Sequence, residues 1–88
     1  MDLILAKSKA GHDKNQVYVV LTEEDIYLFL ANGTTKTISK PKKKKKIHLQ
    51  LIKNIPSEVL EEVGSLETLD DVKIKRILKS YNRRNGNV

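Results

Sequence analysis

Short runs rich in apolar and β-branched residues occupy most of the first fifty residues of the chain, and turn-forming residues separate them. Such runs predict strands, and in the last of them Ile47, Leu49 and Leu51 alternate with polar residues, which predicts one polar face. The runs cover residues 3–7, 16–21, 26–31, 34–39 and 47–51. Asn32-Gly33, between the third and fourth runs, is a strong hairpin signal. Five short strands joined by tight turns predict a small, mainly β barrel.

One face of this predicted barrel collects apolar residues from three of the runs. The residues expected on it are Val17, Val19, Leu21, Ile26, Leu28, Leu30, Ile47, Leu49 and Leu51. Tyr18, Val20, Tyr27 and Phe29 fall on the opposite sides of their strands. Because such a set would otherwise form an exposed apolar patch, we expect another element to cover it.

The last third of the chain has helical periodicity. A short helical segment is predicted from Pro56-Ser57 to Gly64-Ser65. A longer helix is predicted over residues 69–82, where Thr68-Leu69-Asp70-Asp71 resembles a capping arrangement. Its apolar stripe consists of Ile74, Ile77, Leu78 and Tyr81. We expect this helix to dock on the chain's own barrel, with a partner protein as the alternative. The chain therefore divides into a barrel, residues 1–54, and a helical extension, residues 55–88.

The net charge of +6 lies entirely in the predicted barrel. Residues 1–54 hold eleven lysines against five acids, whereas residues 55–88 hold six basic and six acidic residues. Six of the lysines fall within residues 40–46. So much fixed charge within a folded domain favours a polyanionic partner, with a solubilising linker as the alternative. Lysine outnumbers arginine by fourteen to three, so we expect contact with phosphates rather than readout of base edges.

Signals for catalysis are weak in this sequence. It contains no cysteine, which excludes disulfides and thiolate metal sites and suits a reducing cytoplasm. It has no phosphate-binding glycine loop, and no apolar run approaches the ~20 residues of a membrane span. His12-Asp13 and Glu23-Glu24-Asp25 are typical of solvated turns. We therefore expect a protein that is not an enzyme, has no metal or cofactor, and makes no membrane contact.

Residues 8–14, Ser-Lys-Ala-Gly-His-Asp-Lys, resemble the core of a KOW motif, a strand–loop–strand segment of several ribosomal proteins and transcription elongation factors. Ala31-Asn32-Gly33 and the lysine-rich segment ending in His48-Leu49-Gln50 extend the likeness over residues 2–51. The chain is similar to small bacterial KOW-domain RNA-binding proteins, which are related to large-subunit ribosomal proteins of archaea and eukaryotes. The resemblance implies an SH3-like barrel, with Gly11 on the motif's glycine. Asn15 stands where a second glycine is common, and asparagine tolerates the left-handed conformation.

Charge and resemblance together predict an RNA-binding face. The residues expected on it are Lys7, Lys9, His12, Lys14, Lys36, Lys40, Lys42, Lys43, Lys44, Lys45, Lys46 and His48. Gly11 and Gly33 are expected to hold turns. The lysines of residues 42–46 are expected to face solvent, so that replacing them would leave the fold intact.

The expected function is RNA binding in association with the ribosome, through rRNA of the large subunit. The chain is expected to be a cytoplasmic monomer when free, with ribosomal proteins as partners of its C-terminal helix. One alternative is a transcription-associated or RNA-chaperone protein that uses the same face. Another is an SH3-like adaptor for proline-rich peptides, which the absence of tryptophan and the presence of only three tyrosines and one phenylalanine disfavour.

Overall fold

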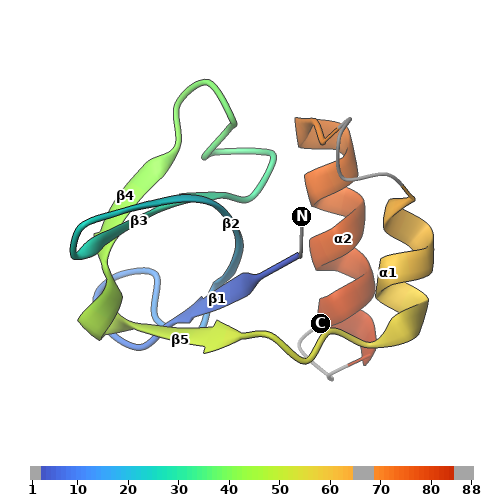
Figure 1. Ribbon diagram of the computed structural model, residues 1–88, viewed down its shortest axis with the longest axis horizontal. Coiled ribbons are helices and arrows are strands. Elements are labelled where there is room, and N and C mark those ends of the chain that lie inside the picture. Colours follow the sequence, from blue (N-terminus) through green and yellow to red (C-terminus); the bar gives the residue numbers. More distant parts are fainter. Residues whose placement is uncertain (1–2, 65–68, 85–88) are drawn as a thin grey trace.

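Five antiparallel strands followed by two α-helices make up the fold (Figure 1). The computed structural model describes residues 3–64 and 69–84. The strands are β1 (Leu5–Ser8), β2 (Val17–Glu24), β3 (Tyr27–Ala31), β4 (Lys42–Lys45) and β5 (Leu49–Ile52), in the sheet order β4-β3-β2-β1-β5. A 3-10 turn, η1 (Lys46–His48), joins β4 to β5, and the helices are α1 (Ser57–Val63) and α2 (Asp71–Arg84). The predicted mainly β fold with a C-terminal helix is confirmed. Its edge strands β4 and β5 do not pair with each other, so the described sheet is open.

Apolar side chains form two clusters on opposite faces of this curled sheet. The first lies between the sheet and the helices and consists of Leu3, Leu5, Val17, Val19, Ala31, Val59, Ile74, Ile77, Leu78 and Tyr81. The second lies within the curl and consists of Ala6, Tyr18, Leu28, Leu30 and Leu49. The apolar stripe of α2 therefore docks on the chain's own sheet, as predicted, and burial of this stripe holds the helix there.

The single apolar face expected from the sequence is wrong. Val20 pairs with Leu30 and Val19 with Ala31, so Val19 and Leu30 point to opposite sides of the sheet. Alternation defines the faces within one strand, but the register between strands decides which faces coincide. Ile26, Ile47 and Leu51, also expected inside, are 50%, 72% and 44% exposed.

Both predicted helices are present. α1 follows Pro56 and ends at Gly64, whose φ is +65°. The Asp70 carboxylate accepts a hydrogen bond from the Lys73 backbone N–H at 2.8 Å, so this acid caps α2. Ser65 and Thr68, which belonged to the predicted helix ends, lie outside the described residues.

The predicted strand over residues 34–39 is wrong. Asn32 Oδ1 accepts hydrogen bonds of 2.9 Å from the backbone N–H groups of Thr34 and Lys36, which folds the chain into a loop. Gly33 adopts a φ of +82° in this loop, not in the predicted two-residue hairpin, and a Cβ there would clash with the Asp71 carbonyl oxygen. Asp71 also accepts a hydrogen bond from the Ile38 N–H at 3.0 Å. The loop therefore docks on the start of α2, and the partner strand of β3 begins eight residues later than predicted.

Candidate nucleic-acid interface

The lysine run forms β4, an edge strand that the sequence did not predict. In its pairing with β3, Lys42 and Lys44 lie opposite the buried residues Leu30 and Leu28, respectively. Lys43 and Lys45 lie opposite Phe29 and Tyr27, respectively. Because directly paired residues share a face of the sheet, β4 sends alternate lysines to its two sides.

Asp13, from the loop between β1 and β2, holds the two inward lysines. Lys44 Nζ lies 2.6 Å from Asp13 Oδ1, and Lys42 Nζ lies 3.1 Å from Asp13 Oδ2. The side chains of Lys44 and Asp13 are each only 12% exposed, and that of Lys42 is 29% exposed. These contacts join β4 to a loop about thirty residues earlier in the chain.

Two hydroxyl groups complete the surroundings of the Asp13 carboxylate. The Ser8 hydroxyl lies 2.9 Å from Oδ1 and accepts a hydrogen bond of 2.7 Å from Lys44, and the Tyr18 hydroxyl donates to Oδ2 at 2.9 Å. Burial alone would raise the pKa of Asp13, but hydrogen bonds from Lys44, Ser8, Lys42 and Tyr18 outweigh it and hold the pKa well below its usual range. Burial and the bond to Asp13 raise the pKa of the Tyr18 phenol well above its usual range. The carboxylate is therefore ionised at neutral pH.

The expectation that all lysines of residues 42–46 face solvent is therefore wrong. Lys42 and Lys44 hold the fold together, and Lys46 pairs with Glu23. Sequence reasoning missed Asp13 as their anchor. The available signal was a lone acid between Lys9 and Lys14, in a loop otherwise free of acids.

The loop of residues 9–15 has the turn chemistry expected of it. Gly11 and Asn15 adopt φ values of +87° and +76°, so both predicted left-handed positions are confirmed. The Asn15 N–H donates to the Ser8 carbonyl at 2.8 Å, and the Lys9 N–H donates to the His48 carbonyl at 2.8 Å. The second of these bonds ties the loop to η1, so loop, β4 and η1 meet at one edge of the sheet (Figure 1).

The exposed lysine and histidine side chains at this junction are here called the basic edge. They are Lys9, His12, Lys14, Lys43, Lys45 and His48. None of its four lysines forms an ion pair with any acid in residues 3–64 and 69–84. The loop cations lie on one flank of β4, whereas Lys43 and Lys45 project from the other.

The other lysines predicted for the RNA-binding face do not join the basic edge. Lys7 is half-buried on the α2 side of the sheet, opposite Val17. Lys36 belongs to the loop that docks on α2, where its carbonyl accepts hydrogen bonds from the Asn32 and Gly33 N–H groups. Lys40 is exposed in the same loop, just before β4.

Tyr27 and Phe29 lie beside the outward lysines, two residues apart on the same face of β3. Both side chains are half-buried, and Lys43 Nζ lies 4.4 Å from the Tyr27 ring centroid and 5.9 Å from that of Phe29. The ammonium group is thus within cation–π range of both rings. The C-terminal helices were expected to cover these aromatic residues, but Tyr27 and Phe29 belong to neither apolar cluster, and the Lys43 side chain lies over them instead.

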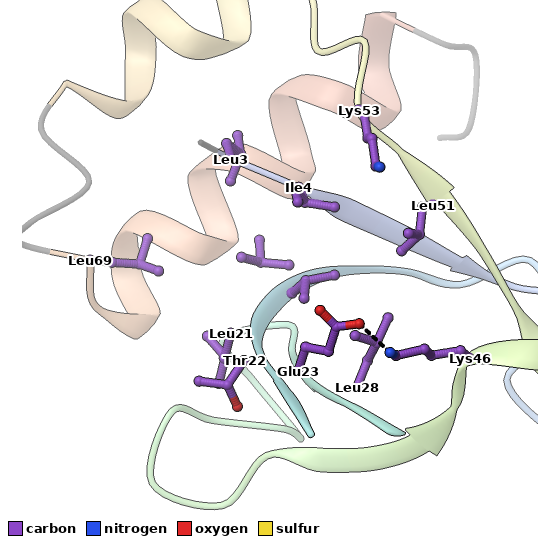
Figure 2. A pocket seen from close by; sticks show the side chains of 12 residues that line it. Leu3, Ile4, Leu21, Thr22, Glu23, Leu28, Lys46, Leu51, Lys53 and Leu69 are labelled. Carbon is purple, nitrogen blue, oxygen red and sulfur yellow. Dashed lines mark hydrogen bonds and ion pairs between the residues drawn. The ribbon is translucent and has the colours of Figure 1, made fainter. Parts of the chain in front are cut away.

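An apolar pocket of about 330 Å³ opens beside β2 and β5, next to the start of α2. Figure 2 shows Glu23 and Lys46 pairing at this pocket, with Leu3, Leu51 and Leu69 around it. The bond from Lys46 lowers the pKa of Glu23. The charged residues that line the pocket are Glu23, Lys46 and Lys53, and the rest of its lining is largely apolar.

Within the described ranges, no three His, Asp or Glu residues gather in a way that could hold a metal ion. None of the helices described is long and apolar enough to cross a membrane. No protein-family model matches the chain, and none of the curated proteins matches it. The basic edge is therefore the feature from which a function can be inferred.

Proposed function

We propose that this chain is a KOW-type RNA-binding protein that associates with rRNA of the large ribosomal subunit and has no catalytic role. The open, curled sheet is then an SH3-like barrel, and residues 9–15 are its KOW loop. The sheet order and the 3-10 turn between β4 and β5 support this assignment. The observation that carries the proposal is the pairing of Asp13 with Lys42 and Lys44, which fixes two sets of exposed cations at one edge.

The basic edge suits the phosphate backbone as a ligand. Its lysines act as point charges, and phosphate contacts position a protein on nucleic acid without reading sequence. Because the network around Asp13 holds both backbone segments in place, only the lysine side chains must be ordered on binding. His12 and His48 are exposed and can donate ring N–H groups to phosphate or ribose oxygens.

A pair of charge-matched variants tests this proposal. Lys43→Gln with Lys45→Gln removes two charges from the basic edge, and Arg76→Gln with Lys79→Gln removes two exposed charges from α2. In fluorescence titrations with RNA, the first variant should bind about 10-fold more weakly than the parent at low salt. Its slope of log affinity against log salt should fall by about 1 per lysine. The α2 variant should bind like the parent.

Ribosome association is tested separately by sedimenting a lysate through a sucrose gradient. The protein should migrate with the large subunit and remain there through a high-salt wash, and the variant that lacks Lys43 and Lys45 should be released by that wash. Equal RNA binding by the two charge-matched variants would show that the basic edge is not the RNA site. A protein found only in the soluble fraction would count against the ribosomal part of the proposal.

A further inference from the structure

We propose that Tyr27 and Phe29 form a base-stacking platform, which makes the chain prefer unpaired nucleotides over duplex RNA. This inference rests on the proposed function and adds the form of RNA that is bound. Base stacking on aromatic side chains tolerates any sequence because every base has a π face. The platform is therefore compatible with a basic edge that does not read base edges.

The two rings are positioned for stacking by the sheet itself. They project from the same face of β3, and α2 covers a different part of that face, over Ala31 and Val19. Neither ring belongs to the apolar clusters of the core, and both are half-buried. In the free protein the Lys43 ammonium occupies the space above them, at 4.4 Å from the Tyr27 centroid and 5.9 Å from the Phe29 centroid. A bound nucleotide can interact with the rings and with Lys43 at the same time. Its base takes the place of the ammonium over the rings, and its phosphate forms an ion pair with the displaced ammonium.

The spacing of the rings favours an unpaired strand. Residues two apart on a strand are separated by about 6.6 Å. Successive bases in a duplex are stacked about 3.4 Å apart along each strand. Bases on both rings would therefore stand about twice the stacking distance apart, which requires a strand whose bases have separated. A duplex would present only its backbone to the same surface.

Charges on the two flanks of the platform set the course of the backbone. Lys43 lies opposite Phe29 on the β4 side, and Lys45 lies opposite Tyr27. On the β2 side, Glu24 lies opposite Tyr27. Phosphates are attracted to the lysine flank and repelled by the glutamate flank, so the nucleic-acid backbone runs along β4 with its bases directed over β3.

The apolar surface continues beyond Tyr27. A shallow hollow of about 330 Å³ is lined by Lys45 together with the exposed side chains of Ile26 and Ile47. Since Lys45 also lies opposite Tyr27, the hollow adjoins the platform. It offers an apolar site for a third base of the same nucleic-acid strand.

Titrations of the full chain with an eight-nucleotide oligoadenylate and with a duplex of equal length test the platform. Tyr27→Leu with Phe29→Leu keeps apolar side chains but removes the π faces. This variant should bind oligoadenylate about 10-fold more weakly than the parent and duplex within about 2-fold of it. Circular dichroism should show that the variant folds like the parent. Conservative replacement by Tyr27→Phe should keep parental affinity for both RNAs.

Intrinsic fluorescence gives an independent readout, because the chain has no tryptophan and Tyr18 and Tyr81 are buried at 4% and 9% exposure. Oligoadenylate should quench the parent's tyrosine emission, and Tyr27→Phe should abolish most of that quenching without changing the affinity. If the leucine variant loses affinity for both RNAs equally, or for neither, the platform is refuted while RNA binding by the basic edge stands. If the parent binds neither RNA at low salt, the proposed function fails and the platform fails with it.

Discussion

Asp13→Asn should strongly destabilise this domain. The substitution preserves shape but leaves Lys44, only 12% exposed, without its counter-charge. Removing one partner of a fully buried ion pair costs about 3–5 kcal/mol. Because Lys42 is 29% exposed, we expect Asp13→Asn to lower the free energy of unfolding by a smaller amount, about 2–4 kcal/mol. A domain of this length has a total stability of about 4–13 kcal/mol, so the loss is a large share of it.

Urea denaturation followed by circular dichroism measures this loss. We expect a lower midpoint with an unchanged denaturant slope, and a melting temperature about 10–25 °C lower than that of the parent. Glu23→Gln is the matched control, because it also removes an acid from a lysine, but Glu23 is 64% exposed. Exposed ion pairs contribute about 0–1 kcal/mol. If Asp13→Asn costs no more than Glu23→Gln, the Asp13 network does not hold β4 in place.

The contribution of Asp13 to stability should fall as the solution becomes more acidic. The pKa of Asp13 in the folded chain lies well below its ordinary value of about 3.9, so the unfolded chain takes up the proton first as the pH falls. The stabilisation by the ionised carboxylate is therefore complete above about pH 5 and is lost as the pH falls toward the folded pKa. The gap in stability between the parent and Asp13→Asn should narrow below about pH 4. A gap that widens on acidification would contradict this assignment.

Three further outcomes are expected. Gly33→Ala should lower the free energy of unfolding by about 3 kcal/mol and Gly64→Ala by about 1 kcal/mol, as measured by urea denaturation. Both glycines have positive φ, but of the two only Gly33 has backbone atoms where a Cβ would lie, so equal losses would contradict this reasoning. Ser80→Ala should leave the stability unchanged or raise it by up to about 1 kcal/mol, since the buried Ser80 Oγ has no hydrogen-bond partner among the described residues. A clear loss of stability would show that this hydroxyl does have a hydrogen-bond partner. The affinity of the basic edge for single-stranded RNA should have a log–log salt slope of about −3, from four lysines. A slope of about −5, the value expected for seven lysines, would show that the lysines paired with Asp13 and Glu23 also bind RNA.

Features of the fold that depend on neighbouring residues could be predicted from the sequence. Apolar and β-branched runs located β1, β2 and β3, and helical spacing located α2 within two residues of its ends. Gly11 and Asn15 were expected to adopt positive φ because glycine and asparagine tolerate the left-handed conformation and both fall within the KOW-like loop, and both do. These signals lie within a few residues of the feature they specify.

The features that were missed depend on contacts distant in sequence. Lysine is depleted in strands, so the run of lysines gave no signal for a strand. The run nevertheless forms β4, because it pairs with β3 and is bound to Asp13. Which lysines point outward follows from the register, since Lys43 lies opposite Phe29 and Lys44 opposite Leu28. Sequence reasoning therefore located the basic segment but could not divide it into lysines that hold the fold and lysines that face solvent.

The position of the lysine run at an edge of the sheet has a consequence for assembly. An edge strand exposes unpaired backbone N–H and C=O groups that can recruit a strand from another molecule, and lysine is among the residues that prevent this. In β4 the deterrent comes mainly from Lys43 and Lys45, because Lys42 and Lys44 point to the other face and share the single negative charge of Asp13. The side chains proposed to hold RNA therefore also keep RNA-free copies of the chain from joining edge to edge. If RNA binds as proposed, replacing Lys43 and Lys45 by neutral residues should both weaken that binding and make the chain more prone to aggregate.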